Sequence, residues 1–222
     1  MTILQSKPLL LRSCEAGLFG KNHVYEKGFI AEALFTYLSG EPNEAFFNQL
    51  CMPKRGRHLV CLSEQWESFI RQNYPDAETY VRYQMKSADH FVFPDLDGLS
   101  SEFEVRKFGE KEFEVKPFSH GINYKSPEDF AANGAGAVVW HAGKIVSSAS
   151  SFISFENEIE LDFSTLEDYR RKGLANHCIH KMLKDCENRR LWVHWDAQTE
   201  LSEKIAFKFG FELDQSYIVY IV

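Results

Sequence analysis

No apolar run in this sequence is long enough to cross a membrane. The longest runs, such as Ala135–Trp140 and Tyr217–Val222, fall far short of the roughly 20 residues that a transmembrane helix requires. The N-terminus also lacks a basic segment that leads into a long apolar stretch and a cleavage site. We therefore expect no membrane partner and no secretory signal.

Regularly spaced cysteines and an excess of basic charge are also missing. The five cysteines are an odd number at irregular spacings, which predicts a reduced, cytoplasmic chain rather than a disulfide framework. The formal net charge is -7 and the pI is near 5.6. A nucleic-acid partner would need a dominant cluster of Lys and Arg, so we expect none.

The sequence does carry ample material for a packed core. Its 222 residues are 44% hydrophobic and 14% aromatic, and this length is sufficient for one large or two small domains.

The first half of the chain gives mixed local signals. Apolar spacing over Gly28–Leu38 predicts a helix that ends at the turn-forming cluster Gly40–Asn43, and a second helix is predicted over Glu44–Leu50. Ser63 is a typical N-cap residue, which predicts a third helix beginning at Glu64.

A strand and a loop follow. The aromatic and β-branched residues between Asp76 and Lys86 favour a strand. The segment from Asp89 to Glu102 is rich in turn-forming residues, so it is the best candidate for a boundary between two lobes.

The second half alternates strands and helices. A β-hairpin is predicted over Ala137–Ala149, and period-two alternation predicts a strand over Glu158–Thr165. A helical stripe that includes Leu174, Cys178 and Met182 then extends to about Asn188. Further elements are predicted at Leu191–Val193 (strand), Leu201–Phe209 (helix) and Tyr217–Val222 (strand). This order predicts an α/β fold.

A basic, glycine-containing turn stands where the strand gives way to the helix. Its residues are Arg170, Arg171, Lys172, Gly173, Leu174 and Ala175. The first turn of a helix has unpaired N–H groups and the positive end of the helix dipole, which together favour a bound diphosphate. Gly173 and Ala175 let phosphate approach the backbone, and the three basic side chains add positive charge. The alternative is a solvated basic helix start.

The turn and its surroundings resemble the GNAT acetyltransferase superfamily. The superfamily motif Arg/Gln-x-x-Gly-x-Gly/Ala matches Arg170, Gly173 and Ala175. The segment from Trp195 to Phe211 is similar to the subfamily that includes the zwittermicin A resistance acetyltransferase. That subfamily usually has Asn where Thr199 stands.

The resemblance implies a fold and a cofactor. It implies a GNAT fold, with a mixed, splayed central sheet flanked by helices, over residues 109–222, and an α/β N-terminal lobe over residues 1–108 that shapes the acceptor site. It also implies acetyl-CoA as co-substrate, with its pantetheine arm against Phe163–Thr165 and further cofactor contacts from Thr199 and Ser202.

Acetyl transfer to an amine requires a group that removes a proton. Glu158, Glu160 and Asp162 alternate with apolar residues on the predicted strand, and the superfamily commonly uses a carboxylate there. Asp162 and Glu160 are the preferred candidates for the catalytic base, and their alternative role is a solvated acidic face. This choice assumes that alternate residues of the strand share one face, and a bulge in the strand would reverse that assignment.

Other residues are reserve candidates for proton transfer or substrate binding. The superfamily often places a tyrosine that protonates the leaving thiolate where Ala206 stands here, so Tyr217, Tyr220 or water would have to replace it. His194 is a second possible base, and Asp196 is a candidate for binding.

Two other kinds of chemistry are disfavoured. His177, Cys178, His180 and Cys186 share one predicted helix, but no further ligand completes a tetrahedral set, so we expect no metal. A Cys–His hydrolase built from Cys51, Cys61 or His58 has no supporting local signature.

The sequence therefore predicts an N-acetyltransferase that moves acetyl from acetyl-CoA to a primary amine of a small molecule. The protein is expected to be a monomer or a homodimer. The alternative is a catalytically lapsed module that binds CoA or a partner.

Overall fold

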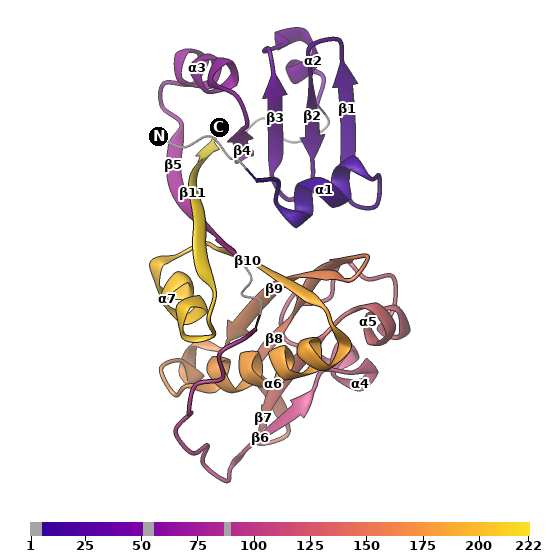
Figure 1. Ribbon diagram of the computed structural model, residues 1–222, viewed down its shortest axis with the longest axis vertical. Coiled ribbons are helices and arrows are strands. Elements are labelled where there is room, and N and C mark those ends of the chain that lie inside the picture. The colour runs from indigo at the N-terminus through magenta and orange to yellow at the C-terminus, as the bar shows by residue number, and fades with distance from the viewer. Residues whose placement is uncertain (1–5, 51–55, 87–89) are drawn as a thin grey trace. The chain divides into compact units, whose positions relative to one another are not determined.

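The computed structural model describes residues 6–50, 56–86 and 90–222. These residues form two compact units (Figure 1). The first unit holds the described residues up to Gln84 together with Ala197–Glu200 and Leu213–Val222, and the second holds the described residues of Met85–Asp196 and Leu201–Glu212. The chain therefore returns to the first unit at its C-terminal end.

The first unit is a mixed sheet with three helices. Its strands lie in the order β1-β2-β3-β4-β11-β5, and only β3 and β4 are parallel among the pairs with a described register. The strands are β1 (Lys21–Tyr25), β2 (Gly28–Glu32), β3 (Thr36–Gly40), β4 (His58–Cys61), β5 (Glu78–Lys86) and β11 (Glu212–Ile221). The helices are α1 (Leu9–Glu15), α2 (Glu44–Asn48) and α3 (Glu64–Asn73).

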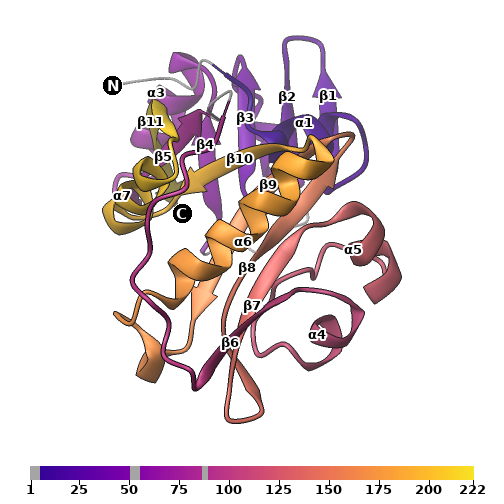
Figure 2. The same ribbon diagram turned by 60° about the horizontal axis from the view of Figure 1, so that its bottom comes forward.

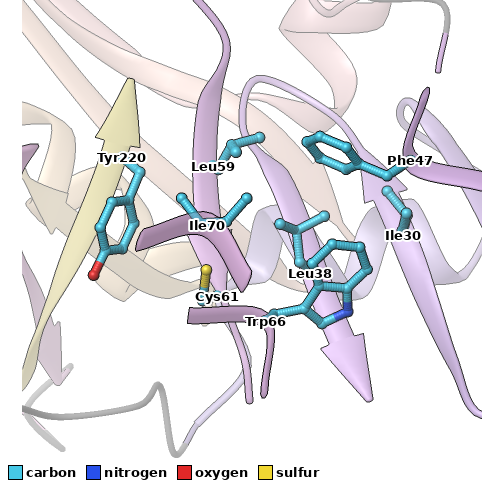
Figure 3. Close-up of a cluster of buried hydrophobic side chains, with 8 residues drawn as sticks. All are labelled: Ile30, Leu38, Phe47, Leu59, Cys61, Trp66, Ile70 and Tyr220. Carbon is cyan, nitrogen blue, oxygen red and sulfur yellow. The ribbon is translucent and has the colours of Figure 1, made fainter. Parts of the chain in front are cut away.

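The core of the first unit lies between its sheet and helices α2 and α3. Figure 3 shows its buried side chains converging from β2, β3, β4, β11 and the two helices. Trp66 and Ile70 supply the apolar face of α3, which begins where expected because the Ser63 hydroxyl accepts a hydrogen bond from Trp66 N.

The prediction of a helix over Gly28–Leu38 is wrong. That segment forms the antiparallel strands β2 and β3, which pair from Gly28 opposite Gly40 to Glu32 opposite Thr36. Consecutive residues of both strands are buried, so the polar-apolar alternation of a one-sided strand is missing. A Cβ at Gly28 would lie 2.1 Å from Ser39 O, so this pairing requires glycine.

The second unit is also a mixed sheet, with strands in the order β10-β9-β8-β7-β6. Strands β9 and β10 are parallel and the other pairs are antiparallel. The strands are β6 (Phe103–Lys107), β7 (Gly136–His141), β8 (Lys144–Phe155), β9 (Glu158–Thr165) and β10 (Trp192–Ala197). The helices are α4 (Glu110–Val115), α5 (Pro127–Asn133), η1 (Glu167–Tyr169), α6 (Leu174–Arg189) and α7 (Glu200–Lys208).

Helices cover both faces of this second sheet. Helix α6 packs on β7 and β8 and extends along the sheet (Figure 2). Val138 instead packs with Phe108 and Phe130 in an aromatic cluster beside α4 and α5. The two sides of β7 therefore face different helices, which explains why this strand is apolar from Ala137 to Trp140.

The expected mixed α/β fold is confirmed, as are the hairpin, strand and helix predictions of the second half of the chain. The division into a lobe over residues 1–108 and a domain over residues 109–222 stays a prediction. The two compact units are defined by contacts, and contacts do not establish which segments fold independently. Among the helices of the described residues, none is long and apolar enough to cross a membrane.

Candidate functional site

A left-handed turn joins β9 to α6. After η1, Arg171 and Gly173 adopt φ angles of 62° and 76°. Gly173 is the N-cap residue of α6 and provides no side-chain cap, and the N–H groups of Asn176 and His177 both donate to Gly173 O. The helix N-terminus is therefore open to an external acceptor, which is the arrangement that binds phosphate groups.

Gly173 has open space where a side chain would begin. A Cβ built at this position meets no heavy atom within 4 Å, and the positive φ favours glycine. Gly173 also lines a cleft. The missing side chain therefore leaves the backbone accessible to a ligand.

The cleft at this turn has a volume of about 690 Å³. Its wall comes from the end of β9, the turn, the start of α6, and Leu201 and Ile205 of α7. The predicted cofactor residues that line it are Phe163, Thr165, Arg170, Arg171, Gly173, Leu174 and Ala175. The structure thus brings together a predicted pantetheine-binding strand and a predicted diphosphate-binding turn.

A second cleft, of about 670 Å³, adjoins the first. It lies between the loop Pro94–Ser100 and the turn, and it contains the predicted cofactor residue Lys172. Arg171, Gly173, Asn176 and Lys208 line both clefts. The two clefts therefore meet at the turn.

Strands β9 and β10 separate beside the first cleft. Their parallel pairing runs from Glu158 opposite Trp192 to Glu160 opposite His194 and ends there. The rest of β9 continues to Thr165 and stays paired with β8 on its other edge. The β10-facing edge of Phe163–Thr165 is therefore available to an extended ligand that hydrogen-bonds like a strand.

The three candidate carboxylates share one face of β9, as expected. Ile159 and Leu161 between them are buried, and the register shift in this region lies on β8, between Ser151 and Ile153. Because the bulge is not on β9, alternate residues of β9 share one face, as the sequence predicts.

Asp162 has a neighbour that sequence reasoning missed. Its Oδ2 lies 3.2 Å from His120 Nε2, and the Asp162 side chain is 42% exposed whereas His120 is 1% exposed. His120 Nδ1 is hydrogen-bonded to the hydroxyl of Ser148 on β8. His120 lies in the connection between α4 and α5, where no periodic pattern marks it in the sequence.

The other carboxylates have different surroundings. Glu158 Oε2 lies 2.5 Å from His194 Nε2, so the reserve base His194 already contacts a carboxylate. Glu160 lies between Glu158 and Asp162 on the same face and opposite His194 on β10. The role of catalytic base stays a prediction for Asp162 and Glu160.

Two predicted cofactor residues, Thr199 and Ser202, are not among the residues that line the first cleft. Ser202 Oγ accepts a hydrogen bond of 3.0 Å from Trp195 Nε1, and the Trp195 ring packs against Phe163. Thr199 belongs to the segment Ala197–Glu200 of the first unit. Their contacts to cofactor stay predictions. Asn176, Lys208 and Phe118 line the clefts without having been singled out as site residues.

The candidate proton donors Tyr217 and Tyr220 lie on β11 in the first unit. Tyr220 OH donates a hydrogen bond of 2.7 Å to Glu67 Oε1. Burial raises the pKa of Tyr220, and the bond to Glu67 raises it further. Both effects make Tyr220 a weaker acid.

The cysteines in the described part of the chain are buried thiols. Burial raises the pKa of Cys61, Cys178 and Cys186 to about 12, which opposes the thiolate that a nucleophile or metal ligand requires. Cys51 lies outside the described residues. Within the described ranges, no group of three or more His, Cys, Asp or Glu is arranged to hold a metal.

Comparison with known proteins identifies the family. A family model described as GNAT acetyltransferase matches residues 4–220. The chain belongs to the GNAT acetyltransferase family. This family transfers acetyl groups from acetyl-CoA, so the resemblance drawn from the turn is confirmed at the level of the family. The closer resemblance to the zwittermicin A resistance subfamily stays a prediction.

Several relatives support this assignment. The uncharacterized N-acetyltransferase YdfB of Bacillus subtilis is 31% identical over 168 residues, which cover 73% of this chain and 64% of YdfB. The crystal structure of a GCN5-related N-acetyltransferase-like protein from Streptococcus suis has a TM-score of 0.84 at 30% identity and covers 98% of this chain and 94% of that one.

A more distant structure shows only the fold. The GCN5-related N-acetyltransferase from Kribbella flavida has a TM-score of 0.62 at 10% identity, over 97% of this chain and 96% of that chain.

Proposed function

We propose that this GNAT protein is an N-acetyltransferase that moves the acetyl group of acetyl-CoA to a primary amine of a small molecule. The observation that carries the proposal is the end of the β9–β10 ladder at Glu160 and His194, beside a cleft that continues to the left-handed turn. An extended acyl-CoA fits this path.

The cofactor is proposed to lie along the clefts with its diphosphate at the turn and its thioester toward Asp162. Its diphosphate would contact the turn at Gly173, where the N-terminus of α6 and the basic side chains favour negative charge. Its pantetheine arm would pair with the free edge of β9 at Phe163–Thr165. The thioester would then lie toward Asp162, which directly precedes Phe163 on the same strand.

The reaction is a direct transfer. The neutral amine attacks the thioester carbonyl carbon and a new C–N bond forms. The tetrahedral intermediate then collapses, the C–S bond breaks, and CoA leaves as thiolate. The amine loses one proton overall, and the thiolate takes up one proton from water.

Asp162 is proposed as the group that accepts the amine proton, directly or through water, with Glu160 as the second candidate. The half-exposed Asp162 side chain remains accessible to an acceptor, whereas Glu158 is paired with His194. An ionised carboxylate within reach of the amine can act as a general base.

The acceptor is proposed to be a small amine. A net charge of -7 attracts cationic amines over long range. The resemblance to a self-resistance acetyltransferase makes antibiotic-like amines worth testing, although a shared fold does not transfer a substrate.

A turnover assay tests the proposal. Purified protein is mixed with acetyl-CoA and a panel of simple amines, polyamines and antibiotic-like amines, and released thiol is measured. We expect at least one amine to cause thiol release with formation of the N-acetyl product. If CoA raises the melting temperature but no amine releases thiol, the chain is instead a catalytically lapsed CoA-binding module.

A further inference from the structure

His120 is a buried histidine held between two polar side chains. It is 1% exposed, its Nδ1 is hydrogen-bonded to Ser148 Oγ, and its Nε2 lies 3.2 Å from Asp162 Oδ2. A histidine buried this deeply normally has its polar atoms satisfied. The neighbours of its two nitrogens therefore determine what the ring can do.

The fold places these three residues together from separate elements. Ser148 and Asp162 lie on β8 and β9, which are adjacent strands, and Ser148 is directly opposite Ser164. His120 comes from the connection between α4 and α5. The nearby Phe118 ring packs against His120 at 5.4 Å and also lines the first cleft. This cluster is thus next to the proposed cofactor site.

The chemistry of the neighbours selects one tautomer of His120. An ionised Asp162 carboxylate can only accept hydrogen bonds, so a lone pair on Nε2 facing it would be repelled. A proton on Nε2 removes this conflict and leaves Nδ1 as an acceptor. The buried Ser148 hydroxyl can then donate to Nδ1.

The contact between His120 and Asp162 is not yet an aligned hydrogen bond. Nε2 is buried and has no hydrogen-bond partner of good geometry among the described residues, although the Asp162 carboxylate is at ion-pair distance. The half-exposed Asp162 carboxylate can reorient toward Nε2, because χ2 of aspartate is a soft torsion.

We propose that His120 is a positioning residue for Asp162, holding its carboxylate through Nε2–H while Ser148 fixes the tautomer. The proposal rests on the proposed function, in which Asp162 accepts the amine proton. Charged and titratable groups on this face include Glu160 and Glu158 on β9, His194 and Asp196 on β10, and His120 itself. Of these, His120 contacts Asp162.

The tautomer can be tested without any turnover. Long-range proton–nitrogen correlation spectra of the full chain labelled with ¹⁵N-histidine distinguish a protonated ring nitrogen from an unprotonated one. The signals of His120 are assigned by their loss in His120→Gln. We expect protonated Nε2 and unprotonated Nδ1 at neutral pH. Protonation of Nδ1, alone or together with Nε2, would overturn the proposal.

Two serines on β8 provide a matched pair for the same spectrum. Ser148→Ala removes the donor to Nδ1 and should introduce the second tautomer. Ser150→Ala removes an equally buried hydroxyl that lies opposite Asp162 and has no hydrogen-bond partner within the described residues. It should leave the His120 signals unchanged. Equal effects of the two substitutions would contradict the role of Ser148.

Measurements of kcat and KM distinguish a positioning role of His120 from a purely packing role. His120→Ala should lower kcat by about 10- to 100-fold, part of the ~10²–10⁴-fold that a general base contributes. The KM for acetyl-CoA should stay unchanged. His120→Gln should recover most of kcat because its amide N–H can occupy the position of Nε2–H, whereas His120→Asn should not.

Failure of the inference is distinguishable from failure of the proposed function. If the wild type acetylates no amine, the proposed function fails, but the tautomer measurement still decides how His120 is arranged. If the wild type is active and Gln restores no more activity than Asn, His120 does not act as an Nε2–H donor.

Discussion

Glu160 and His194 form the last pair of the parallel ladder between β9 and β10. Beyond them, β9 carries Asp162 and then Phe163, the first residue of the strand that lines the cleft. The point at which two strands separate therefore coincides with the transition from acidic side chains to the cofactor cleft. Several measurable consequences follow from this arrangement.

Replacement of Gly173 by leucine should abolish CoA binding. The new side chain would start in the open space where the phosphate is proposed to approach, so loss of affinity follows from steric exclusion. The measurement is the shift in melting temperature caused by CoA.

Gly17 offers a matched control for this substitution. It has a φ of 73°, close to the 76° of Gly173, and a Cβ there also meets nothing within 4 Å. Both leucine variants should lose about 1–2 kcal/mol of stability from left-handed strain, but only Gly173→Leu should lose CoA binding. Retained binding in Gly173→Leu would contradict the assignment of the turn.

Asp162→Asn should lower kcat by about 10²–10⁴-fold, because an amide cannot accept the amine proton. CoA should still raise the melting temperature, since Asp162 is not part of the cleft lining. Glu158→Gln is the comparison variant from the same strand face. A larger loss in Glu158→Gln than in Asp162→Asn would remove Asp162 from the proposed role.

Lys172→Gln should weaken CoA binding by roughly tenfold, the effect of losing a charge-assisted bond of about 1.5 kcal/mol. Lys172 lines the second cleft beside the turn, where phosphate is proposed to bind. The exposed Lys181 on α6 lines neither cleft at the turn, so Lys181→Gln is the control. Titration calorimetry at two salt concentrations should show a smaller salt dependence for Lys172→Gln alone.

The stability of the fold should decrease at alkaline pH. Burial raises the pKa of Cys61, Cys178 and Cys186 to about 12, against about 8.5 for an unfolded thiol. Above pH 8.5 the unfolded chain therefore releases protons that the folded chain retains. The free energy of unfolding should fall by up to about 1.4 kcal/mol per pH unit for each thiol, until the folded pKa is reached.

Urea unfolding between about pH 8 and pH 9 measures this slope, because an unfolded tyrosine of pKa about 10 is at most roughly one-tenth ionised in that range. Cys178→Ala should reduce the slope of the free energy of unfolding against pH by the contribution of one thiol, whatever its effect on stability at pH 7. An identical slope in the variant would show that Cys178 ionises normally in the folded protein.

The sequence predicted local features where one strong signal was present. Ser63 correctly marked the start of α3, because a side-chain cap acts over three residues. Alternation correctly identified β9 and the common face of its carboxylates. The helix predicted over Gly28–Leu38 failed because β2 and β3 are buried on both faces, and burial on both faces depends on neighbours far away in the chain.

The amino-acid sequence by itself determined the turn from Arg170 to Ala175, whose residues lie close together in the chain, and this turn indicated the family. Only the tertiary structure decided that β9 and β10 separate after Glu160, and that His120 lies beside Asp162. The physical reason is that strand separation and a contact across 42 residues both result from packing between distant segments, which no local periodicity records.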